Sequence, residues 1–125
     1  MTPGVRPLIA GNWKMHGTLA EAAALAGAVR DGAAGLPADL LVCPTFLHVA
    51  GVGSLLAGSA VAVGGQDCHA ASKGAHTGDV AAPMLRDAGA SHVILGHSER
   101  RADHGESDAA VRATAQAAAA AGLVP

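Results

Sequence analysis

One stretch of the sequence begins with a short apolar run and then changes abruptly to polar and charged residues. It reads His92-Val93-Ile94-Leu95-Gly96-His97-Ser98-Glu99-Arg100-Arg101. The run His92–Leu95 is too short for a helix and is closed by Gly96, so it predicts a buried strand followed by a loop. In folds built from alternating strands and helices, ligand-binding groups gather beyond the carboxyl ends of the strands. The residues after Gly96 are therefore candidates for chemistry.

Three similar apolar runs precede this one, at Pro7–Ala10, Leu40–Val42 and Ala60–Val63. Their apolar character is nearly continuous, which is typical of parallel strands covered on both faces. The segment Leu123–Pro125 looks like the opening of a fifth strand. We therefore predict four buried parallel strands in a chain that stops partway through its fold.

Helical patterns separate these runs. In the first pattern, Thr18 and Glu21 have the spacing of a capping box, and an apolar stripe follows them. The stripe consists of Leu19, Ala22, Ala26, Val29 and Ala33.

Three further helices are predicted with less regular patterns. The alternation of strands and helices implies right-handed strand–helix–strand units and a parallel sheet, either doubly wound or closed into a barrel, and the pattern alone does not choose. The second helix carries Val49, Val52 and Leu55 or Leu56 on one side, the third is a short turn at Pro83–Ala88 that stops at Gly89, and the last runs from a Ser107 or Glu106 cap through Asp108 to Gly122.

Composition narrows the function classes. The 125 residues have a net charge of -2 without charge runs, which argues against nucleic acid and anionic membranes as partners. The chain has no apolar signal peptide and no run long enough to span a membrane, so the cytoplasm is expected. Cys43 and Cys68 form no Cys-x-x-Cys pair and are predicted to be buried reduced thiols. The seven histidines show no His-x-x-x-His spacing, so no metal site is predicted.

Two residues at predicted strand ends could take part in catalysis or binding. Lys14 can place a positive charge near a phosphate or a developing oxyanion, although an arbitrary lysine is more often a solvated surface residue. His97 can donate or relay a proton, although most histidines are ordinary structural side chains. Neither residue decides the function by itself.

Three segments in order along the chain resemble signatures of one family. Gly11–Met15, Gly74–Asp79 and Val93–Arg101 are similar to the opening motif, the third loop and the most specific internal motif of triosephosphate isomerases. The resemblance implies an α/β fold, the amino-terminal half of a (β/α)8 barrel with about four parallel βα units. Residues 1–125 would form this partial barrel domain, since a full barrel takes about 250 residues.

The resemblance also implies an activity. The family interconverts dihydroxyacetone phosphate and glyceraldehyde 3-phosphate in glycolysis and gluconeogenesis, without cofactor or metal. It is a standard example of catalysis by a glutamate base, a neutral histidine and a closing loop, so this mechanism is taken over from the family. By motif position His97 is the histidine, Asn12 and Lys14 bind substrate, Ser98 lies near the base, and Glu99 pairs with Lys14.

Members of the family are homodimers in which the third loop of each subunit enters the neighbouring subunit. Thr77 is then expected near Asn12 and His97 of a second copy, Asp79 is expected to pair with Arg100 of that copy, and Gln66 is assigned to the same contact. The sequence departs from the family pattern at two positions. His76 stands where an aromatic residue is common, and Asp79 replaces the usual glutamate.

The proton-abstracting glutamate of the family is expected beyond residue 125, so the 125-residue chain alone is predicted to be inactive. Two alternatives stay open. One is a half-barrel that folds or associates without turnover, and the other is a different barrel enzyme that uses Lys14 as a Schiff-base nucleophile.

Overall fold

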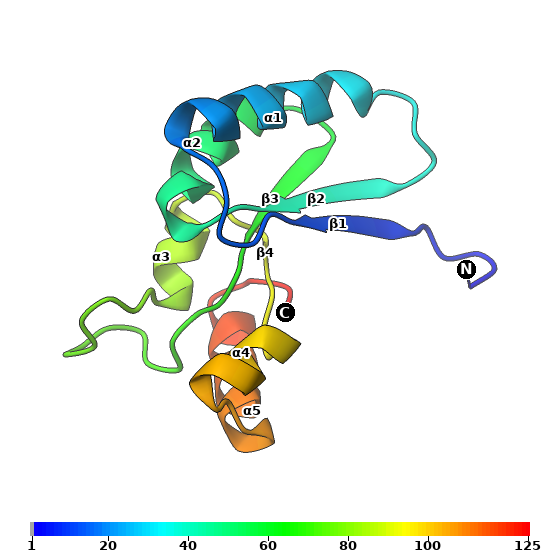
Figure 1. Ribbon diagram of the computed structural model, residues 1–125. Helices are drawn as coiled ribbons and strands as arrows, with labels where there is room; N and C mark the ends of the chain where they lie inside the picture. Colours follow the sequence, from blue (N-terminus) through cyan, green and yellow to red (C-terminus); the bar gives the residue numbers. More distant parts are fainter. Residues whose placement is uncertain (1) are drawn as a thin grey trace.

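Strands and helices alternate along residues 2–125, the part of the chain that the computed structural model describes. The strands form one parallel sheet in the order β1-β2-β3-β4 (Figure 1). The predicted parallel α/β architecture is therefore confirmed. The strands are β1 Leu8–Asn12, β2 Asp39–Cys43, β3 Val61–Gly65 and β4 His92–Val93, and the helices are α1 Leu19–Gly32, α2 Phe46–Leu56, α3 Ala82–Asp87, α4 Ser98–His104 and α5 Asp108–Ala120.

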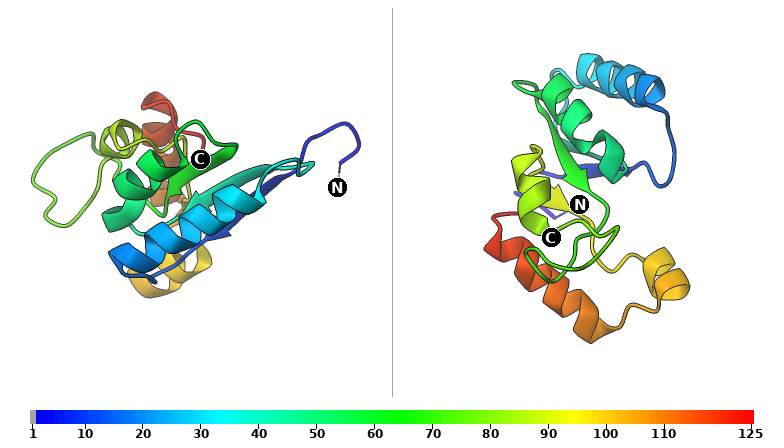
Figure 2. Two further views of the ribbon diagram at one scale, coloured as in Figure 1. Left: turned by 90° about the horizontal axis from the view of Figure 1, so that it is seen from above. Right: turned by 90° about the vertical axis from the view of Figure 1, so that its left-hand side faces the viewer.

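The sheet is curved, and the helices α1, α2, α3 and α5 form an arc around its outer side (Figure 2). Because all the strands run in the same direction, their carboxyl ends lie at one edge. A fifth strand begins beside β4, where His92 bridges Val124 in parallel and the Val93 N–H donates to the Val124 carbonyl at 3.0 Å. None of the helices within residues 2–125 is long and apolar enough to cross a membrane.

The strands β1, β2 and β3 extend further than predicted, whereas β4 ends at Val93, two residues before the predicted end at Leu95. β3 continues through Gly64 and Gly65, where glycine was interpreted as the end of the strand. A Cβ at Gly65 would lie 2.8 Å from Leu85 Cδ1, so the glycine lets α3 pack closely against the sheet. β1 likewise runs on to Asn12, which is in register with Cys43 of β2.

The prediction that each strand is covered on both faces is wrong for β1. Leu8 is 48% exposed and Ile9 is 58% exposed, whereas β2 and β3 are largely buried. Among residues 2–125, β1 lies at the edge of the sheet and pairs with β2 alone. The apolar core lies between the central strands and the helices, and its larger members are Val42, Val49, Val52, Leu56, Val63, Leu85, Val93 and Leu123.

The predicted helix starts at Thr18 and Ser107 agree with the structure, whereas α5 ends at Ala120 rather than at the predicted Gly122. Thr18 Oγ1 accepts the Glu21 N–H at 3.2 Å, and Glu21 Oε2 accepts the Thr18 N–H at 3.4 Å, which completes the capping box of α1. Ser107 caps α5 by accepting the Ala110 N–H. The α1 stripe is only partly buried, because Leu19 at the start of the helix points to solvent.

Thr18→Ala is expected to lower the free energy of unfolding by about 1 kcal/mol, because one backbone N–H of the first turn loses its acceptor. Thr18→Ser keeps the hydroxyl and should stay close to wild type. Urea unfolding followed by circular dichroism would measure both variants. Equal stability of the alanine and serine variants would mean that the capping box does not contribute.

Candidate active site

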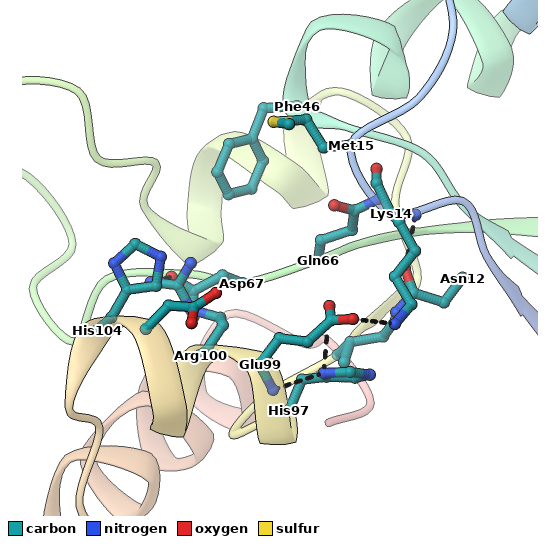
Figure 3. Close-up of a pocket in the computed structure, with 12 residues that line it drawn as sticks. Asn12, Lys14, Met15, Phe46, Gln66, Asp67, His97, Glu99, Arg100 and His104 are labelled. Carbon is teal, nitrogen blue, oxygen red and sulfur yellow. Dashed lines mark hydrogen bonds and ion pairs between the residues drawn. The ribbon is translucent and has the colours of Figure 1, made fainter.

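A cavity of about 360 Å³ opens at the carboxyl ends of the strands (Figure 3). Its polar side chains come from the end of β1 and the turn after it, from the segment after β3, and from α4 with its N-cap, so residues distant in sequence meet there. The cavity is lined by Asn12, Lys14, Met15, Phe46, Gln66, Asp67, Ile94, His97, Glu99, Arg100, Asp103 and His104.

Lys14 has an unusual backbone. Its φ of 56° makes it the one non-glycine residue with positive φ among residues 2–125, and such strain typically costs about 1–3 kcal/mol. Hydrogen bonds hold it on both sides. The Lys14 N–H donates to Asn12 Oδ1 at 3.0 Å, and Gln66 Nε2 donates to the Lys14 carbonyl at 2.7 Å. Gln66 Nε2 also donates to the Cys43 carbonyl at 2.9 Å, which ties this turn to the end of β2.

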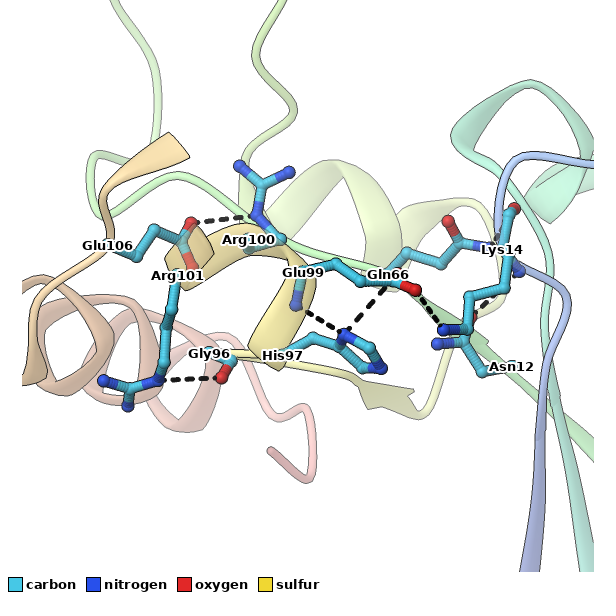
Figure 4. Close-up of polar contacts among 9 residues, drawn as sticks. All are labelled: Asn12, Lys14, Gln66, Gly96, His97, Glu99, Arg100, Arg101 and Glu106. Carbon is cyan, nitrogen blue, oxygen red and sulfur yellow. Dashed lines mark hydrogen bonds and ion pairs between the residues drawn. The ribbon is translucent and has the colours of Figure 1, made fainter. Parts of the chain in front are cut away.

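The Lys14 ammonium is fixed by Glu99. Nζ lies 2.5 Å from Glu99 Oε1, which is the pairing expected from the sequence (Figure 4). The hydrogen bond from Lys14 lowers the pKa of Glu99, slight desolvation opposes it, and the charges of Lys14 and His97 lower it further. Glu99 is therefore ionised at neutral pH and is a weak proton acceptor. Because the folded-state pKa is lowered, the pair stabilises the fold above the usual carboxyl range and loses this effect as pH falls through the lowered pKa.

His97 occupies the N-cap position of α4, and its Nδ1 accepts the Glu99 N–H at 3.1 Å. An Nδ1 that accepts a hydrogen bond carries no hydrogen, so the ring hydrogen of the neutral imidazole lies on Nε2. Nδ1 also lies 3.6 Å from Glu99 Oε2, a contact that is attractive only when the imidazole is protonated. In its neutral form the ring presents an oriented Nε2–H donor.

The turn into His97 depends on Gly96. Its φ is +61°, and a Cβ there would lie 2.8 Å from both methyl carbons of Val111. The Gly96 carbonyl accepts the Arg101 Nε–H at 3.0 Å. The glycine thus lets the chain turn from β4 into α4 while α5 packs against the turn.

Gly96→Ala is expected to destabilise the fold by about 2–4 kcal/mol, because a positive φ and a steric clash act together. Gly105→Ala is a matched control, since Gly105 has a φ of +65° and nothing within 4 Å of an added Cβ. That variant should lose only about 1 kcal/mol. Thermal unfolding of both variants measures the difference, and equal losses would rule out the Val111 contact as the cause.

Arg100 binds two carboxylates of its own chain. Its Nη2 lies 3.0 Å from Asp67 Oδ2, and its Nε lies 2.8 Å from Glu106 Oε2. Burial raises the pKa of Asp67, and the Arg100 charge opposes that shift. Asp67 Oδ1 is buried with no hydrogen-bond partner among the described residues. Asp67 belongs to the polar pair Gln66-Asp67 that follows the third predicted strand, but the sequence analysis gave it no role.

Other predicted site residues lie outside the cavity. Ser98 begins α4 next to His97 but does not line the cavity, and Thr77 and Asp79 lie on the exposed loop between β3 and α3, yellow-green in Figure 1. His104 and Asp103 line the cavity from α4, which the sequence did not indicate.

The two cysteines are free and buried, as predicted. Burial raises the pKa of the Cys43 thiol to about 11, and burial together with the Asp67 charge does the same for Cys68. Both thiols therefore stay protonated at neutral pH. Within residues 2–125, no three His, Cys, Asp or Glu side chains gather closely enough to hold a metal ion.

Comparison with known proteins identifies the family. The sequence model of the family described as "Triosephosphate isomerase" matches residues 7–125. The chain belongs to the triosephosphate isomerase family. A triosephosphate isomerase from Bradyrhizobium sp. (strain ORS 278) is 61% identical over 99% of the chain and 50% of that protein. One from Gluconacetobacter diazotrophicus is 53% identical over 97% of the chain and 50% of that protein.

A solved structure agrees with this assignment. The crystal structure of triosephosphate isomerase from Bartonella henselae matches 96% of the chain and 50% of that protein, with a TM-score of 0.91 and 48% identity. The four βα units are therefore half of a triosephosphate isomerase barrel, as predicted. The chain spans about half the length of the curated relatives it matches.

Proposed function

We propose that this chain supplies the substrate-binding and carbonyl-polarising half of a triosephosphate isomerase. The protein interconverts dihydroxyacetone phosphate and glyceraldehyde 3-phosphate in cytoplasmic glycolysis and gluconeogenesis, without cofactor or metal. The observation that carries this proposal is the meeting of Lys14 and His97 in one cavity, with their orientations fixed by Glu99.

The cavity suits the charge that the reaction creates. Removal of a proton beside a carbonyl builds negative charge on the carbonyl oxygen, and fixed donors aimed at that oxygen lower the barrier. His97 Nε2–H is such a donor, and the Lys14 ammonium stabilises both the enediolate and the phosphate. Asn12 supports this role because its side chain holds the Lys14 backbone.

The three glutamates of the chain are already engaged. Glu99 is paired with Lys14, Glu106 with Arg100, and Glu21 caps α1. The abstracting base is therefore proposed to lie outside residues 1–125, as in the family. Ser98, at the start of α4, is proposed to lie near that base in the open enzyme.

We propose further that the protein is a homodimer. The exposed loop carrying Thr77 and Asp79 would enter a second copy, and Gln66 and Arg100 would lie at the same contact. Arg100 already binds Asp67 and Glu106, so Asp79 would add a third carboxylate to an occupied guanidinium. We therefore expect that contact to be weak or bridged by water.

Assay of the isolated 125-residue chain tests whether the proton-abstracting base lies outside it. We expect no turnover above background in a coupled assay, because a site without a positioned proton acceptor rarely forms the charge it stabilises. The same chain with both Lys14→Met and His97→Gln is the control for contaminating host enzyme. Turnover that survives purification and falls in the double variant would contradict the proposal, since a contaminant would be unaffected.

A Schiff-base role for Lys14 is disfavoured by its ion pair. Glu99 stabilises the charged ammonium, whereas a nucleophilic lysine needs a lowered pKa. Borohydride treatment with dihydroxyacetone phosphate should therefore leave Lys14 unmodified, and a trapped adduct would favour the alternative enzyme class.

A further inference from the structure

The loop between β3 and α3 folds back on its own base. At the base, the His69 N–H donates to the Val80 carbonyl at 2.8 Å, and His69 bridges Ala81. Further out, the rings of His69 and His76 are stacked, with centroids 3.9 Å apart and planes inclined by 25°. Residues 72–79 are exposed and project away from the sheet and helices (Figures 1 and 2). The stack is thus a contact that joins the outer part of the loop to its base.

We propose that the His69–His76 stack is a pH-sensitive latch that holds this loop closed when both rings are neutral and releases it when they are protonated. Histidine is the side chain whose charge ordinarily changes between pH 5 and 8. The consequence for association of two copies rests on the proposed function, because there the same loop enters the neighbouring subunit.

The hydrogen bond at the base of the loop requires an unprotonated Nδ1 on His69. That Nδ1 accepts the Ala71 N–H at 2.8 Å, so this nitrogen carries no hydrogen in the closed loop. Protonation would place a hydrogen on Nδ1, facing the Ala71 N–H, and the bond would be lost. The turn from His69 to Ala71 would then open.

Charge repulsion between protonated rings would also open the loop. Two imidazolium rings at the observed separation of 3.9 Å would repel each other. Two charged side chains line the small cavity beside the stack. Lys73 adds a like charge, whereas the opposite charge of Asp79 offsets part of the repulsion.

The loop backbone is shaped around His76. Gly74 has a φ of +139°, and a Cβ there would lie 3.4 Å from His76 Cδ2 and Nε2. The His76 N–H donates to the Gly74 carbonyl at 3.0 Å, and the His76 carbonyl accepts the Asp79 N–H at 3.0 Å. Movement of the His76 ring would therefore shift Asp79 and the intervening Thr77, the residues proposed to contact a second copy.

The test compares wild type with His76→Phe in the protein that contains residues 1–125. Phenylalanine can keep the stack but cannot acquire charge. NMR relaxation of residues 72–79 would report loop order, and sedimentation velocity would report association, both between pH 7.5 and 5.5. For wild type we expect loss of loop order and a rise of about 10-fold or more in the dimer dissociation constant at pH 5.5. His76→Phe should keep an ordered loop and nearly constant association.

A second histidine variant is the control for pH effects that do not involve the loop. His16 is exposed and lies outside the loop, so His16→Phe should retain the full pH response of wild type. A wild-type loop that stays ordered at pH 5.5, or equal loss of order in His76→Phe, would overturn the latch. A loop that opens without any change in association would support the latch and contradict the proposed dimer contact.

Discussion

His97→Gln is expected to lower kcat by about 10²–10³-fold while KM changes little, the loss typical of removing one oriented donor from a developing oxyanion. The imidazole is held by the Glu99 N–H at Nδ1, which leaves Nε2–H as its donor. A glutamine amide lacks this ring geometry and cannot relay a proton. Because the donor matters most when charge appears on oxygen, the loss should fall on the chemical step.

Steady-state kinetics of the complete protein would measure the effect. His16→Gln is a matched control, because it removes an exposed imidazole outside the cavity. That variant should keep wild-type kcat. A folded His97→Gln enzyme with unchanged kcat would contradict the assignment of His97, whereas loss of folding would be detected separately by circular dichroism.

Lys14→Met is expected to impair both binding and turnover, with kcat/KM falling by about 10²-fold or more. The ammonium would meet the substrate phosphate in the ground state and the enediolate in the transition state. The side chain of Lys14 is 41% exposed, so added salt should reproduce part of the binding defect in wild type. Glu99 would lose its main partner, and its pKa should rise toward the usual carboxyl range.

Two comparisons separate this effect from general loss of charge. Arg30→Met removes an exposed positive charge on α1, where Arg30 pairs with Asp31, and should leave kinetics unchanged. Lys14→Arg keeps the charge but changes its shape and reach, so it should recover binding more than turnover. A Lys14→Met enzyme with wild-type KM and kcat would show that the ammonium is merely solvated.

Local patterns predicted the elements of the fold well. The capping box at Thr18 and Glu21 and the positive φ of Gly89 and Gly122 follow from short-range chemistry, and the structure contains them. The end of β3 was wrong because Gly64 and Gly65 serve packing against Cys43 and Leu85. That contact depends on residues far away in sequence, and local patterns do not contain it.

The cavity also combines features that local sequence patterns predict with contacts between distant residues that they do not. Strand-end position identified Asn12, Lys14 and His97 as candidates, since carboxyl ends of parallel strands meet at one edge. The partners of Gln66 and Arg100 could not be predicted, because each bond joins separate loops. The exposure of Leu8 and Ile9 was also missed, since an apolar run does not reveal whether its strand lies at an edge.

Solvent exchange during turnover tests the proposed isomerase most directly. The protein that contains residues 1–125 would be incubated with dihydroxyacetone phosphate in deuterated water, and the product analysed by NMR. We expect glyceraldehyde 3-phosphate carrying deuterium at the carbon beside the carbonyl, without added metal or cofactor, and a loss of this exchange in His97→Gln. A folded protein that gives no product, or forms it equally fast without His97, would contradict the proposed function.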